Sequence, residues 1–82
     1  MKTYFQLRSN LLSRGFLVLD IAGDSPALSA EGNGKRVTYW EDRKGDSAFL
    51  VYRGNDVEGY STEDGDEMWS IKDMLQAIGD KK

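Results

Sequence analysis

The sequence predicts an α+β domain in which an antiparallel meander of four to five strands is flanked by an N-terminal and a C-terminal helix. Three observations predict this class: apolar residues at helical spacing near both ends, an Asn33-Gly34 pair in the middle, and short apolar segments between glycines. A chain of 82 residues is long enough for a single domain, so we expect one domain over residues 1–82.

The first helix is expected over residues 1–15. Thr3 and Gln6 have the spacing of a capping box, and Gly15 can adopt the left-handed conformation that ends a helix. One broad face of this helix would carry Tyr4, Leu7, Leu11 and Leu12. Residues 3–8 also alternate well enough for a strand, so the sequence leaves both structures open for this segment.

The next elements are expected to be strands. Residues 16–22 are apolar and lie between two glycines, which predicts a buried strand, and residues 23–26 form a turn with the single proline. Asn33-Gly34 is the preferred pair of a two-residue hairpin loop. This loop predicts the cross-strand pairs Glu31–Arg36, Ala30–Val37 and Leu28–Tyr39, of which the first is of opposite charge.

Two further turns complete the expected meander. A tight turn at Lys44-Gly45 would set Trp40 opposite Phe49 and Tyr39 opposite Leu50, and a turn at residues 54–56 would send residues 57–61 back along 47–53. Strict alternation then defines two faces of the sheet. One face would carry Leu28, Ala30, Val37, Tyr39, Leu50 and Tyr52, and the other Arg36, Thr38, Trp40, Phe49, Val51 and Arg53.

The last helix is expected to begin near residue 64 and to end at Gly79. Asp64 and Glu67 have capping-box spacing, and Asp66 is an equally good N-cap. Lys81-Lys82 would lie near the negative end of its dipole. Its apolar side would consist of Met68, Ile71, Leu75 and Ile78.

Composition excludes several chemistries. The chain has no cysteine and no histidine, so it has no disulfide, no thiolate metal site and no imidazole to activate a serine. No segment is apolar enough for a membrane span or a signal peptide, which predicts a cytoplasmic protein. The charge is uneven: residues 1–53 carry eight Lys or Arg against six Asp or Glu, whereas residues 54–82 carry three against eight.

The remaining catalytic and metal-binding candidates are weak. Asp20 interrupts an apolar strand, but a carboxylate in that position more often pairs with a basic residue at the strand end than acts as an acid. The acidic segment fails the EF-hand pattern, because Ser61 occupies the glycine position when the loop is counted from Asp56. We therefore expect no enzyme, no cofactor and no metal site.

The second sheet face is the most informative candidate surface. If the helices cover only the other face, Trp40, Phe49 and Tyr60 are exposed with arginines beside them, which is typical of interface centres. Alternatively, Trp40 and Phe49 are themselves core residues, with one helix on each face or a register shifted by one.

The acidic segment of residues 54–67 contains six acids and no base, so it can attract a basic protein surface or simply solvate a loop before a helix. This acidic, cysteine-free profile resembles small inhibitors of host factors encoded by phages and mobile elements, of the anti-CRISPR type. The resemblance implies a non-enzymatic inhibitor or adaptor that presents its acidic surface to a basic site on a protein partner. The expected partner-binding residues are Asp56, Glu58, Glu63, Asp64, Asp66, Glu67, Trp40, Phe49 and Tyr60.

Two alternatives remain open. A single-stranded nucleic-acid-binding module would use an aromatic and basic face made of Arg36, Trp40, Phe49 and Arg53, although the net charge of −3 opposes it. A structural subunit would use the same aromatic face for self-association, for example as a homodimer.

Overall fold

The structure is a computed structural model that describes residues 2–21, 23, 25–44 and 46–80. A helix, five strands and a second helix follow one another along the chain. Their bounds are α1 (Lys2–Ser13), β1 (Leu17–Asp20), β2 (Ala27–Gly32), β3 (Lys35–Glu41), β4 (Ser47–Arg53), β5 (Asp56–Ser61) and α2 (Ile71–Ile78). The expected α+β class is confirmed, and residues 2–13 form the helix rather than the alternative strand.

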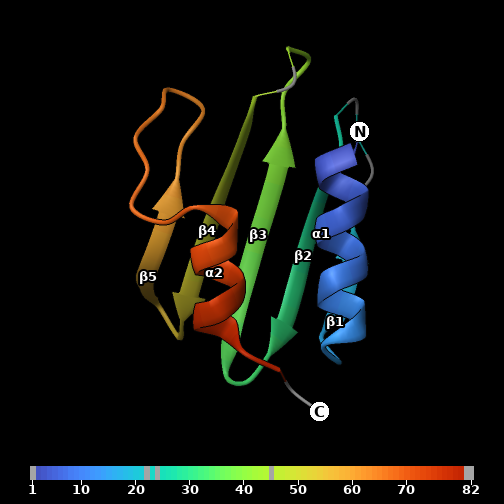
Figure 1. The fold of residues 1–82 in the computed structure, drawn as a ribbon, viewed down its shortest axis with the longest axis vertical. Coiled ribbons are helices and arrows are strands. Elements are labelled where there is room, and N and C mark those ends of the chain that lie inside the picture. Colours follow the sequence, from blue (N-terminus) through green and yellow to red (C-terminus); the bar gives the residue numbers. More distant parts are fainter. Residues whose placement is uncertain (1, 22, 24, 45, 81–82) are drawn as a thin grey trace.

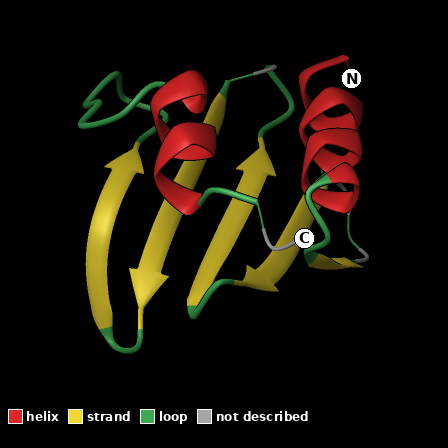
Figure 2. Ribbon diagram, turned by 60° about the horizontal axis from the view of Figure 1, so that its bottom comes forward, coloured by secondary structure: helices red, strands yellow, loops and turns green. Residues whose placement is uncertain are grey.

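The five strands form one antiparallel sheet in the order β1-β2-β3-β4-β5, so each strand pairs with its neighbours in sequence. Both helices pack on the same face of this sheet, α1 over the β1 edge and α2 toward β4 and β5 (Figure 1). The view turned by 60° shows the same two layers, helices on one side and bare strands on the other (Figure 2). The protein is therefore a two-layer structure with one uncovered sheet face.

The hairpin between β2 and β3 has the expected register. Glu31 pairs with Arg36, Ala30 with Val37 and Leu28 with Tyr39. Asn33 and Gly34 both have positive φ, 55° and 73°, as a two-residue loop of this kind requires. This turn therefore determines the register of β2 and β3 at the centre of the sheet.

The expected register between β3 and β4 is wrong by one residue. Tyr39 pairs with Phe49 and Trp40 pairs with Ala48, so Phe49 and Val51 point to the helices while Leu50 and Tyr52 point away. The five-residue connection after Glu41 is not the expected two-residue turn. The Asp42 carboxylate accepts hydrogen bonds from the backbone N–H groups of Lys44 and Asp46, which closes a wider loop.

The expected start of the C-terminal helix is also wrong. Ser70 is the N-cap of α2, and it forms a capping box with Asp73, because each side chain accepts a hydrogen bond from the other residue's backbone N–H. Residues 64–67 belong instead to a loop that follows β5. The end at Gly79 is as expected, whereas Lys81 and Lys82 lie outside the described residues.

Three residues distant in sequence satisfy the last carbonyl groups of α2. The Arg14 guanidinium donates to the Leu75 carbonyl at 3.2 Å, and the amide of Asn33 donates to the Ile78 carbonyl at 2.8 Å. Lys35 Nζ donates to the Ala77 carbonyl at 3.1 Å. These donors, two of them cationic, hold the negative end of the helix against the sheet.

The core lies between the helices and the sheet and contains residues from both. Its buried members are Tyr4, Leu7, Leu11, Phe16, Leu28, Ala30, Val37, Tyr39, Phe49, Val51, Met74 and Ile78. Neither helix in the described part of the chain has the length and apolar character needed to cross a bilayer.

Candidate protein-interaction surface

The sheet face turned away from the helices, called here the open face, follows from the strand pairing. Because directly paired residues of antiparallel strands share a face, three rows of side chains cross it. The open face consists of Leu17, Leu19, Ile21, Ala27, Ser29, Glu31, Arg36, Thr38, Trp40, Ala48, Leu50, Tyr52, Val57 and Tyr60.

This face exposes large apolar side chains at both edges of the sheet. Leu17 and Leu19 on β1 are each 61% exposed, and Val57 on β5 is 49% exposed. The expectation that residues 16–22 form a buried strand is therefore wrong, because β1 has the helix layer on one side only. Apolar side chains are thus left uncovered at both edges of the open face.

The open face is nearly neutral although the protein is acidic. Its two charged residues, Glu31 and Arg36, are cross-strand neighbours of opposite sign. The Arg36 guanidinium also lies over the ring of Tyr52, 4.7 Å from its centre. The charge of the protein is thus concentrated elsewhere.

Much of the negative charge lies in the loop of residues 62–67, called here the acidic loop, which carries Glu63, Asp64, Asp66 and Glu67. The backbone of the loop is ordered by the Thr62 N–H, which donates to the Asp66 carbonyl at 2.8 Å, and by Gly65, whose φ is +96°. Glu67 then pairs with Ser61, so the chain returns along β5. Four carboxylates are held together on one short turn.

The acidic loop joins the open face through one hydrogen bond. The indole Nε1 of Trp40 donates to Glu63 Oε1 at 2.7 Å, from the half-buried end of β3 to the exposed loop. Tyr60, which is 37% exposed, lies on the same face of β5, two strands from β3 and opposite Leu50 of β4. The structure therefore brings together six of the expected partner-binding residues, Trp40, Tyr60 and the four acids of the loop.

The other three expected residues lie elsewhere. Asp56 stands at the opposite end of β5. Glu58 lies next to a bulge in the β4–β5 pairing and contacts Lys35 Nζ at 3.0 Å on the helix-covered side. Phe49 is only 2% exposed and belongs to the core, so it is not available as a surface anchor.

The residues of the alternative nucleic-acid face are separated in the same way. Arg36 and Trp40 are on the open face, whereas Phe49 is in the core. Arg53 pairs with Lys35 across the strands, on the covered side, and its Nε lies 3.6 Å from Glu58 Oε2. The four residues do not form one stacking platform.

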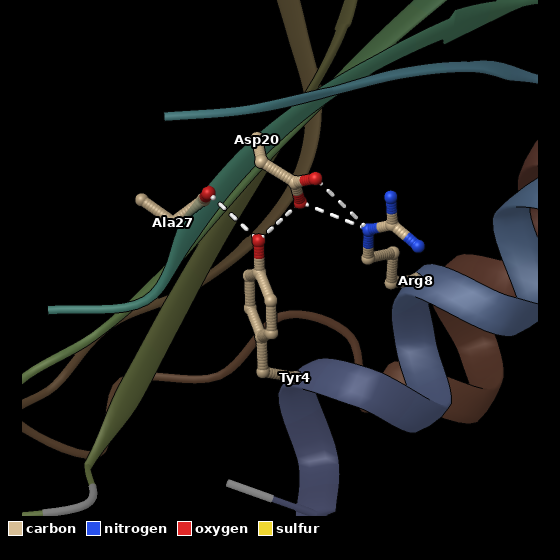
Figure 3. Close-up of polar contacts among 4 residues, drawn as sticks. All are labelled: Tyr4, Arg8, Asp20 and Ala27. Atoms are coloured by element: carbon tan, nitrogen blue, oxygen red, sulfur yellow. Dashed lines mark hydrogen bonds and ion pairs between the residues drawn. The ribbon is translucent and has the colours of Figure 1, made fainter. Parts of the chain in front are cut away.

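Asp20 has a structural partner set. Its carboxylate accepts hydrogen bonds from Arg8 Nε at 3.0 Å and from the hydroxyl of Tyr4, which also donates to the Ala27 carbonyl (Figure 3). The hydrogen bonds from Arg8 and then from Tyr4 lower the pKa of Asp20. Burial and the bond to Asp20 raise the pKa of Tyr4 to about 12. The paired carboxylate thus links α1 to β1.

One buried acid was not anticipated from the sequence. Glu41, at the end of β3, is 3% exposed and accepts a hydrogen bond from the Tyr39 hydroxyl at 2.7 Å. Burial, followed by this bond, raises the pKa of Tyr39. Alternation along β3 places both side chains on the helix-covered side, where they are hydrogen-bonded to each other.

Within the described residues, no group of three acidic side chains is arranged to hold a metal ion. Comparison of the chain with protein-family models, with curated protein sequences and with solved structures finds no match.

Proposed function

We propose that this chain is a small non-enzymatic protein-binding domain, an inhibitor or adaptor that presents the acidic loop to a basic site on a protein partner. The observation that carries the proposal is the hydrogen bond between Trp40 and Glu63, because it couples an aromatic anchor on a rigid sheet to an ordered group of carboxylates. A buried aromatic centre beside complementary charge is the usual composition of an interface.

Charge supports a basic partner. The four carboxylates of the acidic loop are exposed, and exposed negative charge of this kind attracts a cationic surface. The cations Arg8, Arg14, Lys35 and Arg53 form ion pairs with Asp20, Asp80 and Glu58, all outside the loop. The same charge repels nucleic acid phosphates from this corner of the molecule.

The proposal is tested first by locating the contact. Tyr60 is replaced by the photo-cross-linking residue p-benzoylphenylalanine, and Ser9, exposed on α1, is replaced in a matched control. In cells of the organism that encodes the chain, we expect position 60 to cross-link a protein with a basic surface and position 9 not to do so. Equal labelling from both positions would contradict a specific surface.

The second test measures the role of charge with the purified cross-linked partner. Asp64→Asn with Asp66→Asn is compared with Asp56→Asn with Asp80→Asn, which removes the same charge at other sites. We expect the loop variant alone to lower the association rate about tenfold at low salt, with the difference shrinking as salt rises. Micromolar binding of a labelled oligonucleotide that the loop variant tightens would favour the nucleic-acid alternative instead.

A further inference from the structure

We infer that two copies of this chain pack open face to open face, with a twofold axis parallel to the strands between β2 and β3. The dimer would have the helices outside and the two sheets inside. A second copy is a suitable occupant because the open face is neutral, whereas an acidic surface would repel its own copy.

The twofold axis matches the side chains of the face to one another. It sets β1 over β4 of the second copy and β2 over β3, because these strands are equally distant from the axis. Leu19 then faces Leu50 in the middle row, and Leu17 faces Tyr52 in the row beside it. Side chains left 61% exposed in the single chain are covered by apolar partners.

The same axis makes the charges of the face complementary. Glu31 on β2 and Arg36 on β3 occupy one row, so each carboxylate faces the guanidinium of the other copy. An isologous interface repeats the contact twice. If the twofold axis were moved sideways by one strand, Arg36 or Glu31 would lie opposite uncharged residues of the other copy.

The overlap leaves β5 of each copy outside the interface, at opposite edges of the dimer, and Glu63 of the acidic loop reaches Trp40 at the border of the interface. Four strands about 4.8 Å apart and roughly six residues long cover a footprint of about 20 by 20 Å per copy. This footprint, about 400 Å² per copy, is roughly half that of a standard stable interface, so we expect a weak, reversible dimer with a dissociation constant of about 10–100 μM. Trp40 of each copy then lies opposite Ala27 of the other, so self-association competes with a partner that anchors on Trp40.

Analytical ultracentrifugation from about 1 to 300 μM tests the inference. We expect a reversible dimer that Leu19→Lys weakens at least tenfold, while Leu12→Lys on the exposed side of α1 does not. Circular dichroism checks that both variants keep the fold. A monomer at the highest concentration, or a dimer that only Leu12→Lys weakens, would overturn the twofold arrangement.

A charge swap tests the register of the two sheets. Glu31→Arg sets two pairs of like charges across the interface and should weaken the dimer, as should Arg36→Glu. The double variant restores opposite charges within each chain and between chains, so we expect it to dimerise like the original protein. Failure of the double variant to recover, with its fold intact, would refute this axis. These measurements need no partner protein, so their outcome is independent of cross-linking from Tyr60.

Discussion

Gly59 on β5 lies directly against the indole ring of Trp69, so close that a Cβ atom on this residue would stand 2.1 Å from Cε3 of the ring. Gly59 pairs with the buried Val51, and the contact fixes the chain between the acidic loop and α2 on the covered side of the sheet. Because Gly59 has no side chain, Trp69 can pack directly on β5 and close one end of the core.

Gly59→Ala should therefore destabilise the protein, because the methyl group displaces the ring or the strand. We expect a loss of about 1–3 kcal/mol in the free energy of unfolding, measured by urea denaturation. Gly23→Ala is the matched control, since nothing lies within 4 Å of its Cβ position. If both variants unfold at the same urea concentration, Trp69 does not pack on this strand as described.

The corrected register of β3 and β4 makes opposite predictions for two aromatic residues. Phe49→Ala should cost about 3–5 kcal/mol, because this side chain is buried among core residues. Trp40→Ala should cost much less, about 1–2 kcal/mol, because it loses one hydrogen bond and a half-buried contact. Acrylamide should quench Trp40 fluorescence readily in a Trp69→Phe background at submicromolar protein concentration, where we expect the monomer. Equal costs for the two variants would contradict the corrected register, and a protected Trp40 in the monomer would contradict its place on the open face.

These two strands also show why the sequence predicted some of the fold and not the rest. The β2–β3 register was predictable, since a two-residue loop with positive φ at Asn33 and Gly34 allows one pairing only. The β3–β4 loop is longer, and the Asp42 side chain decides its geometry through two backbone bonds. The predicted register differs from the observed one by a single residue. It therefore placed Phe49 on the open face and Leu50 in the core, the reverse of the structure.

The site was predictable in composition but not in arrangement. The acidic segment and the aromatic residues are visible in the sequence, but the bond between Trp40 and Glu63 joins residues 23 positions apart. The true helix start was visible as the Ser70 and Asp73 pair, which competed with several acids upstream. The exposure of the leucines of β1 was not predictable from the sequence. An apolar run indicates a strand buried on both faces, whereas here a single helix layer covers only one face of the sheet.

The turn at Asn33 has a second role that a pair of variants can separate. Asn33→Gly keeps a residue that tolerates positive φ but removes the donor to the Ile78 carbonyl at the end of α2. We expect a loss of about 1 kcal/mol with faster amide exchange in the last turn of α2. Gly34→Val strains the hairpin itself and should cost about 1–2 kcal/mol. Unchanged exchange in α2 for Asn33→Gly would show that the amide does not hold the helix.

The hydrogen-bonded group of Tyr4, Arg8 and Asp20 predicts how stability changes at low pH. The pKa of Asp20 is lowered in the folded protein, so its stabilising contribution is present above its ordinary value of 3.8 and is lost as pH falls below it. Asp20→Asn should therefore be less stable than the original protein at pH 7, and the difference should shrink toward pH 2. Urea denaturation at several pH values measures this, and a constant difference would contradict the pairing.

Tyr4 predicts the opposite dependence at high pH. Its pKa is raised from 10.0 to about 12, so the folded state favours the neutral phenol. Its contribution is fully present below pH 10 and is lost as pH rises from about 10 to 12, because the unfolded chain releases the proton first. Tyr4→Phe should thus be less stable at neutral pH yet lose stability more slowly above pH 10. The pKa of Tyr39 is also raised, so the stability of Tyr4→Phe should still fall somewhat above pH 10. Adding Tyr39→Phe should reduce this remaining dependence on pH. If Tyr4→Phe and the original protein lose stability in parallel from pH 10 to 12, the Tyr4 hydroxyl is not held by Asp20 in solution.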